Sequence, residues 1–144
     1  MKQLLLVTFL LMAGNAIGYA QNADDILGIW FNEEKTAKIE IYKNGDKYFG
    51  KIVWLKEPLR DGKPKLDIHN DDESLRSRPV MGLNILQDFV WDEDDKEWND
   101  GTIYDPKNGE TYSCYITKKG DVLHVRGYIG FSFIGRTTEW TRAE

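Results

Sequence analysis

The residues best suited to bind a charged molecule lie in the predicted strand 122–128. Arg126 and Tyr128 are two positions apart and therefore share one face of that strand. If this face points into a barrel, the guanidinium and the phenol would bind a carboxylate or phosphate group. If it points outward, both belong to the surface, and a shift of one residue in register decides between the two. Because small barrels can hold a single small ligand, we expect the inward orientation.

Two further groups of residues are candidate ligand contacts. The tail of an amphipathic ligand would meet apolar and aromatic side chains, for which the candidates are Trp54, Met81 and Tyr104. Polar candidates come from the segment 58–79 and are Asp67, Asn70 and Arg78. Arg76 and Arg78 have an alternative role, a salt bridge to Asp67 or Asp72 that holds the segment in place, and we favour this alternative.

The segment 58–79 is polar, contains three of the four prolines and shows no sustained hydrophobic period. Structureless segments of this length are uncommon in compact domains unless they are lids or binding loops, so a lid and a plain surface loop both stay open. Within it, Asn70 is expected to cap one helical turn that begins with the acidic residues 71–73. This acidic run and residues 92–95 lack the spacing of an EF-hand, so we predict solvated turns and no metal site.

No recognisable catalytic or cofactor-binding motif is present. The sequence has no H-E-x-x-H, G-x-S-x-G, P-loop or C-x-x-C pattern, and His69 and His124 are far apart in the chain. Cys114, the one cysteine, alternates with Tyr112 and Ile116 in a strand-like run. That pattern favours a small buried apolar residue over a nucleophile. We therefore predict a protein that is not an enzyme and carries no cofactor.

Residues 1–20 have the pattern of a signal peptide, with Lys2 before an apolar stretch and Gly18-Tyr19-Ala20 at its end. Cleavage after Ala20 would leave residues 21–144 as a single domain. Because Lys2 is the one charged residue removed, the net charge would change from −5 to −6. The apolar stretch is shorter than the roughly 20 residues that cross a bilayer. We predict an exported protein, periplasmic or secreted, without stable membrane insertion.

Alternation of apolar and polar residues predicts β-strands along most of the remaining chain. Hairpin turns are predicted at 44–46 and 105–109, where Asn and Gly tolerate positive φ angles. About seven or eight short strands result, and no amphipathic helix of convincing length interrupts them. This spacing predicts an all-β fold, either a β-sandwich or a β-barrel, with one long polar loop.

Two motifs near the ends of this domain resemble those of the calycin group, the lipocalin and fatty-acid-binding barrels. Gly28-Ile29-Trp30 is similar to the early G-x-W motif of lipocalins, and Trp140-Thr141-Arg142 lies near the C-terminus. In lipocalins a late Arg packs over the early Trp. The resemblance implies a single antiparallel up-and-down β-barrel, calycin-like and lipocalin-like, whose closure is structural and rests on Trp30 and Arg142. A guanidinium over an indole is worth ~0.5–2 kcal/mol.

Longer motifs cover nearly all of the chain after residue 20. They are YFGKIVWL (48–55), Asp67 with Asn70-Asp71, RSRPVMGL (76–83), WNDGTIYDP (98–106), Tyr112, VRGYIG (125–130) and GRTTEWTR (135–142). In these motifs the chain resembles a bacterial exported family known as a domain of unknown function (family twenty-one forty-seven). The resemblance implies the fold and carries no established activity. Asp71 stands where that family usually has Pro.

The segment 128–135 is aromatic and contains Gly130 and Gly135. We expect it to be buried as a plug at one barrel end, whereas an exposed segment would be a patch for a partner or a membrane surface.

These observations favour a binding protein. An acidic domain repels nucleic acid phosphates, so nucleic acid is not an expected partner. We predict an exported barrel that binds a small amphipathic or anionic molecule. The alternative is a protein-interaction or envelope-stress module with a filled barrel, and the sequence does not identify a protein partner.

Overall fold

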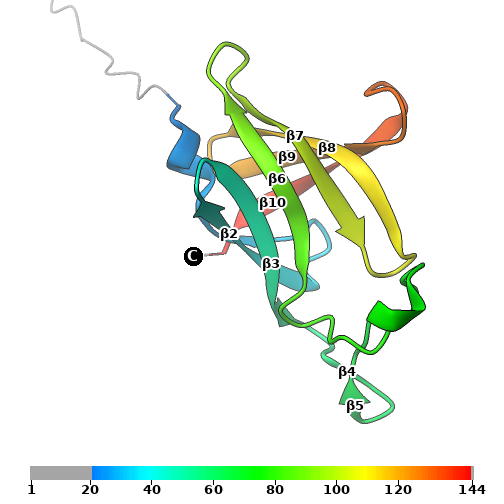
Figure 1. Ribbon diagram of the computed structural model, residues 1–144. Helices are drawn as coiled ribbons and strands as arrows, with labels where there is room; N and C mark the ends of the chain where they lie inside the picture. The colour runs from blue at the N-terminus through cyan, green and yellow to red at the C-terminus, as the bar shows by residue number, and fades with distance from the viewer. Residues whose placement is uncertain (1–20, 144) are drawn as a thin grey trace, which may run out of the picture.

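The computed structural model describes residues 21–143, and these form a closed β-barrel (Figure 1). The expected signal peptide, residues 1–20, lies outside the described residues. Within residues 21–143, eight strands make up the barrel. They are β1 (Gly28–Phe31), β2 (Ala37–Asn44), β3 (Lys47–Leu55), β6 (Asn84–Asp92), β7 (Glu97–Asp105), β8 (Glu110–Lys119), β9 (Val122–Tyr128) and β10 (Gly135–Arg142).

The barrel strands follow one another around the barrel in chain order. Each strand is antiparallel to its neighbours, and β10 closes the barrel by pairing with β1, where Trp30 lies opposite Arg142. Closure leaves no sheet edge free to pair with another chain. The predicted up-and-down antiparallel barrel is therefore confirmed.

The predicted long polar loop connects β3 to β6. It contains a separate two-stranded hairpin, β4 (Leu59–Arg60) with β5 (Lys63–Pro64), and a short 3-10 helix, η2 (Glu73–Leu75). The helical turn begins later than predicted, because Asp72 and not Asn70 is its N-cap. The Asp72 carboxylate accepts a hydrogen bond from the Ser74 backbone N–H, whereas the Asn70 side chain accepts one from the backbone of Asp72.

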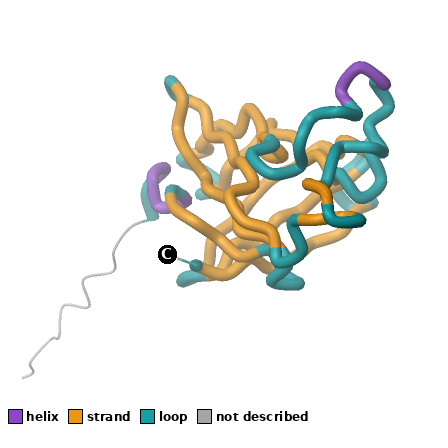
Figure 2. The backbone as a smooth tube through the Cα atoms, turned by 90° about the horizontal axis from the view of Figure 1, so that it is seen from below, coloured by secondary structure: helices purple, strands orange, loops and turns teal. Residues whose placement is uncertain are grey.

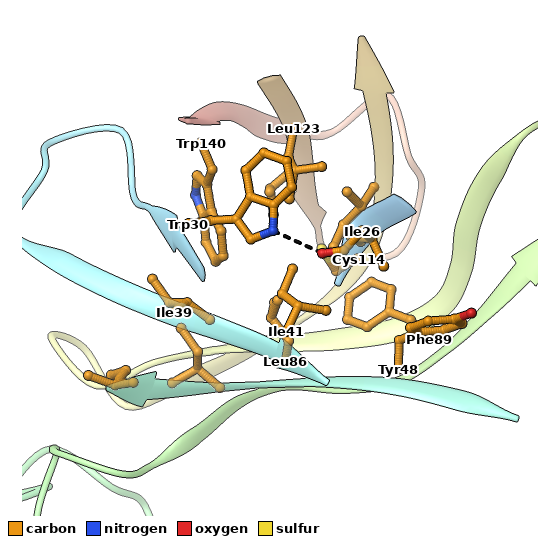
Figure 3. Close-up of a cluster of buried hydrophobic side chains, with 14 of the residues drawn as sticks. Ile26, Trp30, Ile39, Ile41, Tyr48, Leu86, Phe89, Cys114, Leu123 and Trp140 are labelled. Carbon is orange, nitrogen blue, oxygen red and sulfur yellow. Dashed lines mark hydrogen bonds between the residues drawn. The ribbon is translucent and has the colours of Figure 1, made fainter. Parts of the chain in front are cut away.

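One end of the barrel is closed around Trp30, which is fully buried (Figure 3). Its indole Nε1 donates a 2.9 Å hydrogen bond to the carbonyl oxygen of Ile26, the last residue of the 3-10 helix η1 (Ala23–Ile26). The Arg142 guanidinium lies 3.8 Å from the centre of a Trp30 ring. Arg142 also donates to two backbone oxygens of the η1 segment, at 2.7 and 3.1 Å. The contact implied by the lipocalin resemblance is present, and it ties β10 and η1 together across this end.

Other buried side chains fill the space beneath η1. They are Ile41, Tyr48, Leu86, Phe89, Trp98, Cys114, Ile116 and Leu123. The prediction that Cys114 is a small buried apolar residue is confirmed. Burial raises the pKa of its thiol to about 12, so it stays protonated at neutral pH.

η1 and η2 lie at opposite ends of the barrel (Figure 2). Because successive strands alternate in direction, the short turns β2–β3, β6–β7 and β8–β9 share the end that carries η1. Four connections share the other end, namely residues 32–36, 56–83, 106–109 and 129–134. No helix among the described residues is long and apolar enough to cross a bilayer.

The prediction that the segment 128–135 is buried is wrong. Phe131 and Phe133 are 66% and 77% exposed, and Ile129 and Ile134 are exposed as well. The segment forms the connection between β9 and β10 at the end opposite η1, and Trp30 and its neighbours already fill the closed end. This connection, residues 129–134 (the tip), therefore extends from the barrel instead of plugging it.

Candidate functional site

The barrel end opposite η1 contains an open cavity of about 810 Å³. It opens between the four connections that share this end, residues 32–36, 56–83, 106–109 and 129–134, and each contributes to its lining. Its apolar lining comes from Ala37, Ile39, Ile52, Leu55, Val80, Ile85, Ile103, Val125 and Trp140. The barrel is thus filled by side chains at one end and hollow at the other.

In strand β9, inward and outward side chains alternate, and the inward ones contribute to both the filled end and the cavity. Leu123 and Val125 are buried, whereas His124 between them is only partly buried. Leu123 packs into the filled end, and Val125 together with Gly127 lines the cavity. The inward face of β9 is therefore its apolar face.

Arg126 and Tyr128 occupy the other face of β9, so the predicted inward orientation is wrong. The Arg126 guanidinium donates from Nε and Nη2 to the Ser132 carbonyl oxygen, at 3.0 and 2.9 Å, and from Nη1 to the Thr137 hydroxyl. Tyr128 borders the cavity mouth, but its ring packs against Tyr115, the partner of Arg126 across the sheet. The register places Leu123 and Val125 inside, so an anion-binding floor at Arg126 cannot form.

Trp54 and Met81, predicted to surround an apolar tail, also lie outside the cavity. Trp54 is 37% exposed and packs edge-on against Phe31, while Met81 is exposed in the long loop. A β-bulge in β3 explains the position of Trp54. Ile39 pairs with Ile52, but the preceding Lys38 pairs with Trp54, so β3 has one extra residue there. That residue reverses the inward–outward alternation, and Trp54 turns away from the interior.

Tyr104 does border the cavity, and it is joined there to the long loop by a buried polar cluster. Its hydroxyl donates a 2.6 Å hydrogen bond to Asp67, which has 0% exposure. The other oxygen of this carboxylate accepts hydrogen bonds from Asn70 Nδ2 and Arg78 Nε, each at 2.9 Å. We call Asp67, Asn70, Arg78 and Tyr104 the latch, because together they fasten the loop to β7.

The latch has the electrostatics of a buried anion with satisfied hydrogen bonds. Burial on its own would raise the pKa of the Asp67 carboxyl. The hydrogen bonds from Tyr104, Asn70 and Arg78 outweigh that effect and hold the pKa below its ordinary value. Burial and the neighbouring carboxylate raise the pKa of Tyr104 to about 12, so its phenol remains a donor at neutral pH.

Three of the predicted polar ligand contacts therefore belong to the latch and do not line the cavity: Asp67, Asn70 and Arg78. The alternative interpretation of Arg78, a salt bridge that holds the loop in place, is confirmed by its 2.9 Å contact with Asp67. Arg76 instead contacts Glu73 and donates to the backbone oxygen of Asn70.

The turn between β7 and β8 gives the loop a second attachment. Gly109 has a φ of +76°, and a Cβ placed there would lie 1.8 Å from the carbonyl oxygen of His69. The backbone of the loop thus occupies the space that a side chain at 109 would need. Glycine at this position permits both the turn and the contact.

We expect Gly109→Ala to loosen the long loop. The methyl group cannot coexist with the His69 backbone, so the loop must move away, at a cost of about 2 kcal/mol including the strain of positive φ. Hydrogen exchange measured by mass spectrometry should become faster in residues 65–80. Gly120→Ala is the matched control, because Gly120 has a φ of +60° and no atom within 4 Å of the added carbon. Equal effects of the two variants would mean that the contact with His69 does not hold the loop.

Charged side chains surround the cavity mouth. Three cations form ion pairs there: Lys65 with Glu57 at 4.0 Å, Lys107 with Glu34 at 3.1 Å, and Arg136 with Glu33 at 3.5 Å. Lys56 and Arg60 also line the mouth, and within residues 21–143 neither has an ion-pair partner. These two cations are the groups best placed to meet an anionic part of a bound molecule.

Sequence reasoning missed most of the cavity lining. Ala37, Ile39 and Ile52 line the cavity, and the predicted strands did not show which of their faces points inward. The alternation of Ala37, Ile39 and Ile41 against charged neighbours was the available signal for the inward face of β2. No comparable signal marks Lys56 and Arg60, because residues in loops show no hydrophobic period.

Among the described residues, no three His, Cys, Asp or Glu side chains are grouped so that they could hold a metal ion.

Comparison with known proteins gives a family and a fold. The family model described as "Uncharacterized protein conserved in bacteria (DUF2147)" matches residues 28–142. No curated protein matches the chain. Among solved structures, the chain is similar to HP1028 from the human pathogen Helicobacter pylori, described as belonging to the lipocalin family. The TM-score is 0.71 at 20% identity, over 83% of this chain and 84% of that one, and this likeness shows a lipocalin-like barrel.

Proposed function

We propose that this chain, which belongs to the DUF2147 family, binds a small amphipathic molecule with an anionic head group inside its barrel. The observation that carries the proposal is the open apolar cavity of about 810 Å³. Pockets for small molecules usually measure about 300–1,000 Å³ and are lined mainly by apolar side chains with a few polar groups. The lipocalin-like fold supports a ligand in the barrel in general and says nothing of its identity.

The apolar part of the ligand would occupy the hollow half of the barrel. Ile39, Ile52 and Val125 face this space from three different strands, and Trp140 adds a large aromatic surface. Moving an apolar chain from water onto such surfaces is worth about 25 cal/mol per Å² of buried area. The filled half beneath η1 limits how deep the ligand reaches. An alternative in which side chains fill the whole barrel does not fit this cavity.

The anionic head group would lie at the mouth and not deep in the barrel. Lys56 and Arg60 are the mouth cations without an acidic partner among the described residues, so a carboxylate or phosphate there would not have to displace an existing ion pair. Charge-assisted hydrogen bonds to such groups are stronger than neutral ones. These cations take the role that the sequence had suggested for Arg126.

Native mass spectrometry of gently purified protein, with organic extraction of the bound molecule, tests the proposal. We expect a stoichiometric adduct with an apolar chain and an acidic group. The mass of the protein itself also identifies its N-terminal residue. We further propose that the protein is exported, and a chain that begins at Gln21 would support this. An unliganded mass that persists after incubation with lipid extracts would contradict the binding function.

Blocking the cavity should remove the adduct. Ala37 lies at the start of β2 and faces the cavity, so Ala37→Trp puts an indole into the empty space. We expect affinity for a fluorescent polyene fatty acid to fall by at least about tenfold, because the probe and the indole need the same volume. Thr117→Trp on the outer side of β8 is the matched control and should bind as the wild type does.

A polyene alcohol of equal length should bind more weakly than the acid if Lys56 and Arg60 contact the head group.

A further inference from the structure

The connection between β9 and β10 exposes four apolar side chains beside the cavity mouth. Ile129, Phe131, Phe133 and Ile134 are each more than half exposed, and the backbone of 129–134 extends away from the barrel wall (orange in Figure 1). Ile129 and Ile134, at the base of this tip, also line the cavity. Exposed apolar residues gathered in one place usually mark a site that contacts a membrane or another protein.

The tip is an ordered turn that holds its aromatic rings outward. The Ile129 backbone N–H donates to the Ile134 carbonyl at 3.3 Å, and the Ile134 N–H donates to the Phe131 carbonyl at 2.9 Å. Arg126 holds the Ser132 carbonyl with two hydrogen bonds. The Phe131 and Phe133 rings stack with centroids 5.5 Å apart and a 10° angle between planes. These contacts fix the backbone while the outer faces of both rings stay in water.

The charge around the tip differs from that of the whole chain. The chain carries a net charge of −5, but residues 122–138 contain Arg126 and Arg136 and no Asp or Glu. Acidic side chains come close to this segment from other elements: Glu33 reaches Arg136 at 3.5 Å, and Glu97 and Asp100 line a hollow together with Tyr128 and Ser132. The hairpin across the mouth contains four basic and two acidic residues within 56–65, and Leu59 at its edge is exposed. Apolar tips next to basic side chains suit the interface of an anionic bilayer.

We propose that the 129–134 tip docks the open end of the barrel on an anionic lipid bilayer, with Phe131 and Phe133 in the interfacial region. A bilayer fits this shape better than a protein does, because a specific protein interface buries about 800 Å² on each side and this tip is one short turn. Docking places the cavity mouth at the lipid surface. The proposal goes beyond ligand binding in the barrel and holds whether or not the cavity contains a ligand.

Vesicle flotation tests the docking. The protein is mixed with large vesicles of phosphatidylethanolamine and phosphatidylglycerol, or of phosphatidylcholine alone, and the floated fraction is measured. We expect the wild type to float with the anionic vesicles and less with the neutral ones. The double variant Phe131→Ser/Phe133→Ser should lower the partition coefficient by about tenfold or more, because two apolar rings no longer leave water. Val90→Ser, an exposed apolar residue of β6 on the outer wall, is the control and should float as the wild type does.

Three results would overturn the proposal. The first is a wild type that stays in solution with anionic vesicles, and the second is a double variant that floats equally well. The third is a dimer, seen by sedimentation equilibrium, that the double variant loses without any vesicle binding, since the tip would then contact a second copy. Ala37→Trp separates this proposal from the binding function, because blocking the cavity should leave flotation unchanged.

Discussion

Replacing Asp67 with alanine is expected to lower the free energy of unfolding by about 3 kcal/mol at neutral pH. The substitution removes a fully buried carboxylate that accepts hydrogen bonds from Tyr104, Asn70 and Arg78. The buried Tyr104 hydroxyl would lose its acceptor, whereas Arg78 is partly exposed and can turn to water. Urea unfolding monitored by tryptophan fluorescence measures the loss. Asp71→Ala, an exposed residue of the same loop, should change stability by less than about 0.5 kcal/mol.

The effect of Asp67 should depend on pH in a defined direction. Its pKa in the fold lies below the ordinary value of 3.8, so the carboxylate stabilises the fold at pH values above 3.8. That contribution is lost as the pH falls through the lowered pKa. The difference between wild type and Asp67→Ala should therefore be full at pH 7 and shrink below about pH 4. A difference that stays constant down to pH 2 would show that the charge of Asp67 does not stabilise the latch.

Trp30→Ala should be the most damaging single change, with a loss of about 4 kcal/mol. The substitution leaves a void in the filled half of the barrel and removes the hydrogen bond that fixes η1 through Ile26. It also leaves the Arg142 guanidinium without the ring on which it stacks. Thermal and urea unfolding measure the loss.

Trp54→Ala is the matched control for Trp30→Ala, because it removes the same side chain from the outer wall. Trp54 is 37% exposed, so we expect a loss of about 1 kcal/mol from its contact with Phe31. Similar losses in the two variants would mean that the closed end is not the main core. If Trp30→Ala does not fold, Trp30→Phe keeps part of the volume and should show a smaller loss of the same kind.

The two ends of the barrel have separate roles. The end near η1 holds the large buried side chains that stabilise the fold, and Trp30 with Arg142 closes it. The other end has the cavity and the loops that carry the proposed functions. The latch belongs to the cavity end, where it fastens the longest loop to β7 through Tyr104, so its substitutions should lower stability. Substitutions of the cavity-lining side chains and of Lys56 and Arg60 should change binding with little loss of stability, whereas those near η1 should do the reverse.

Local patterns in the sequence were sufficient to predict an all-β fold of short strands. Alternation and turns such as Asn108-Gly109 predicted a sandwich or a barrel, since strand period and turn chemistry are properties of neighbouring residues, and the resemblance to lipocalins selected the up-and-down barrel. The stacking of Arg142 on Trp30 followed from a resemblance to lipocalins and is present in the structure. The burial of Cys114 followed from its alternation with Tyr112 and Ile116.

The residues that line the cavity could not be predicted, because local patterns do not show which face of a strand points inward. Alternation divides a strand into two faces but does not identify the inward face, so Arg126 was placed inside when Val125 in fact lines the cavity. The bulge in β3 reverses the alternation between Ile52 and Trp54, and nothing in the residue types there marks it.

The pattern of strands and turns, together with the resemblance to lipocalins, was enough to predict the barrel and the contact of Trp30 with Arg142. The residues that line the cavity and those that fasten the loop could not be predicted in this way. Asp67 and Tyr104 are 37 positions apart, and the loop backbone at His69 meets Gly109 across a similar separation. Such contacts arise from the closure of the barrel, which fixes register and loop position together, and a chain read residue by residue does not contain that geometry.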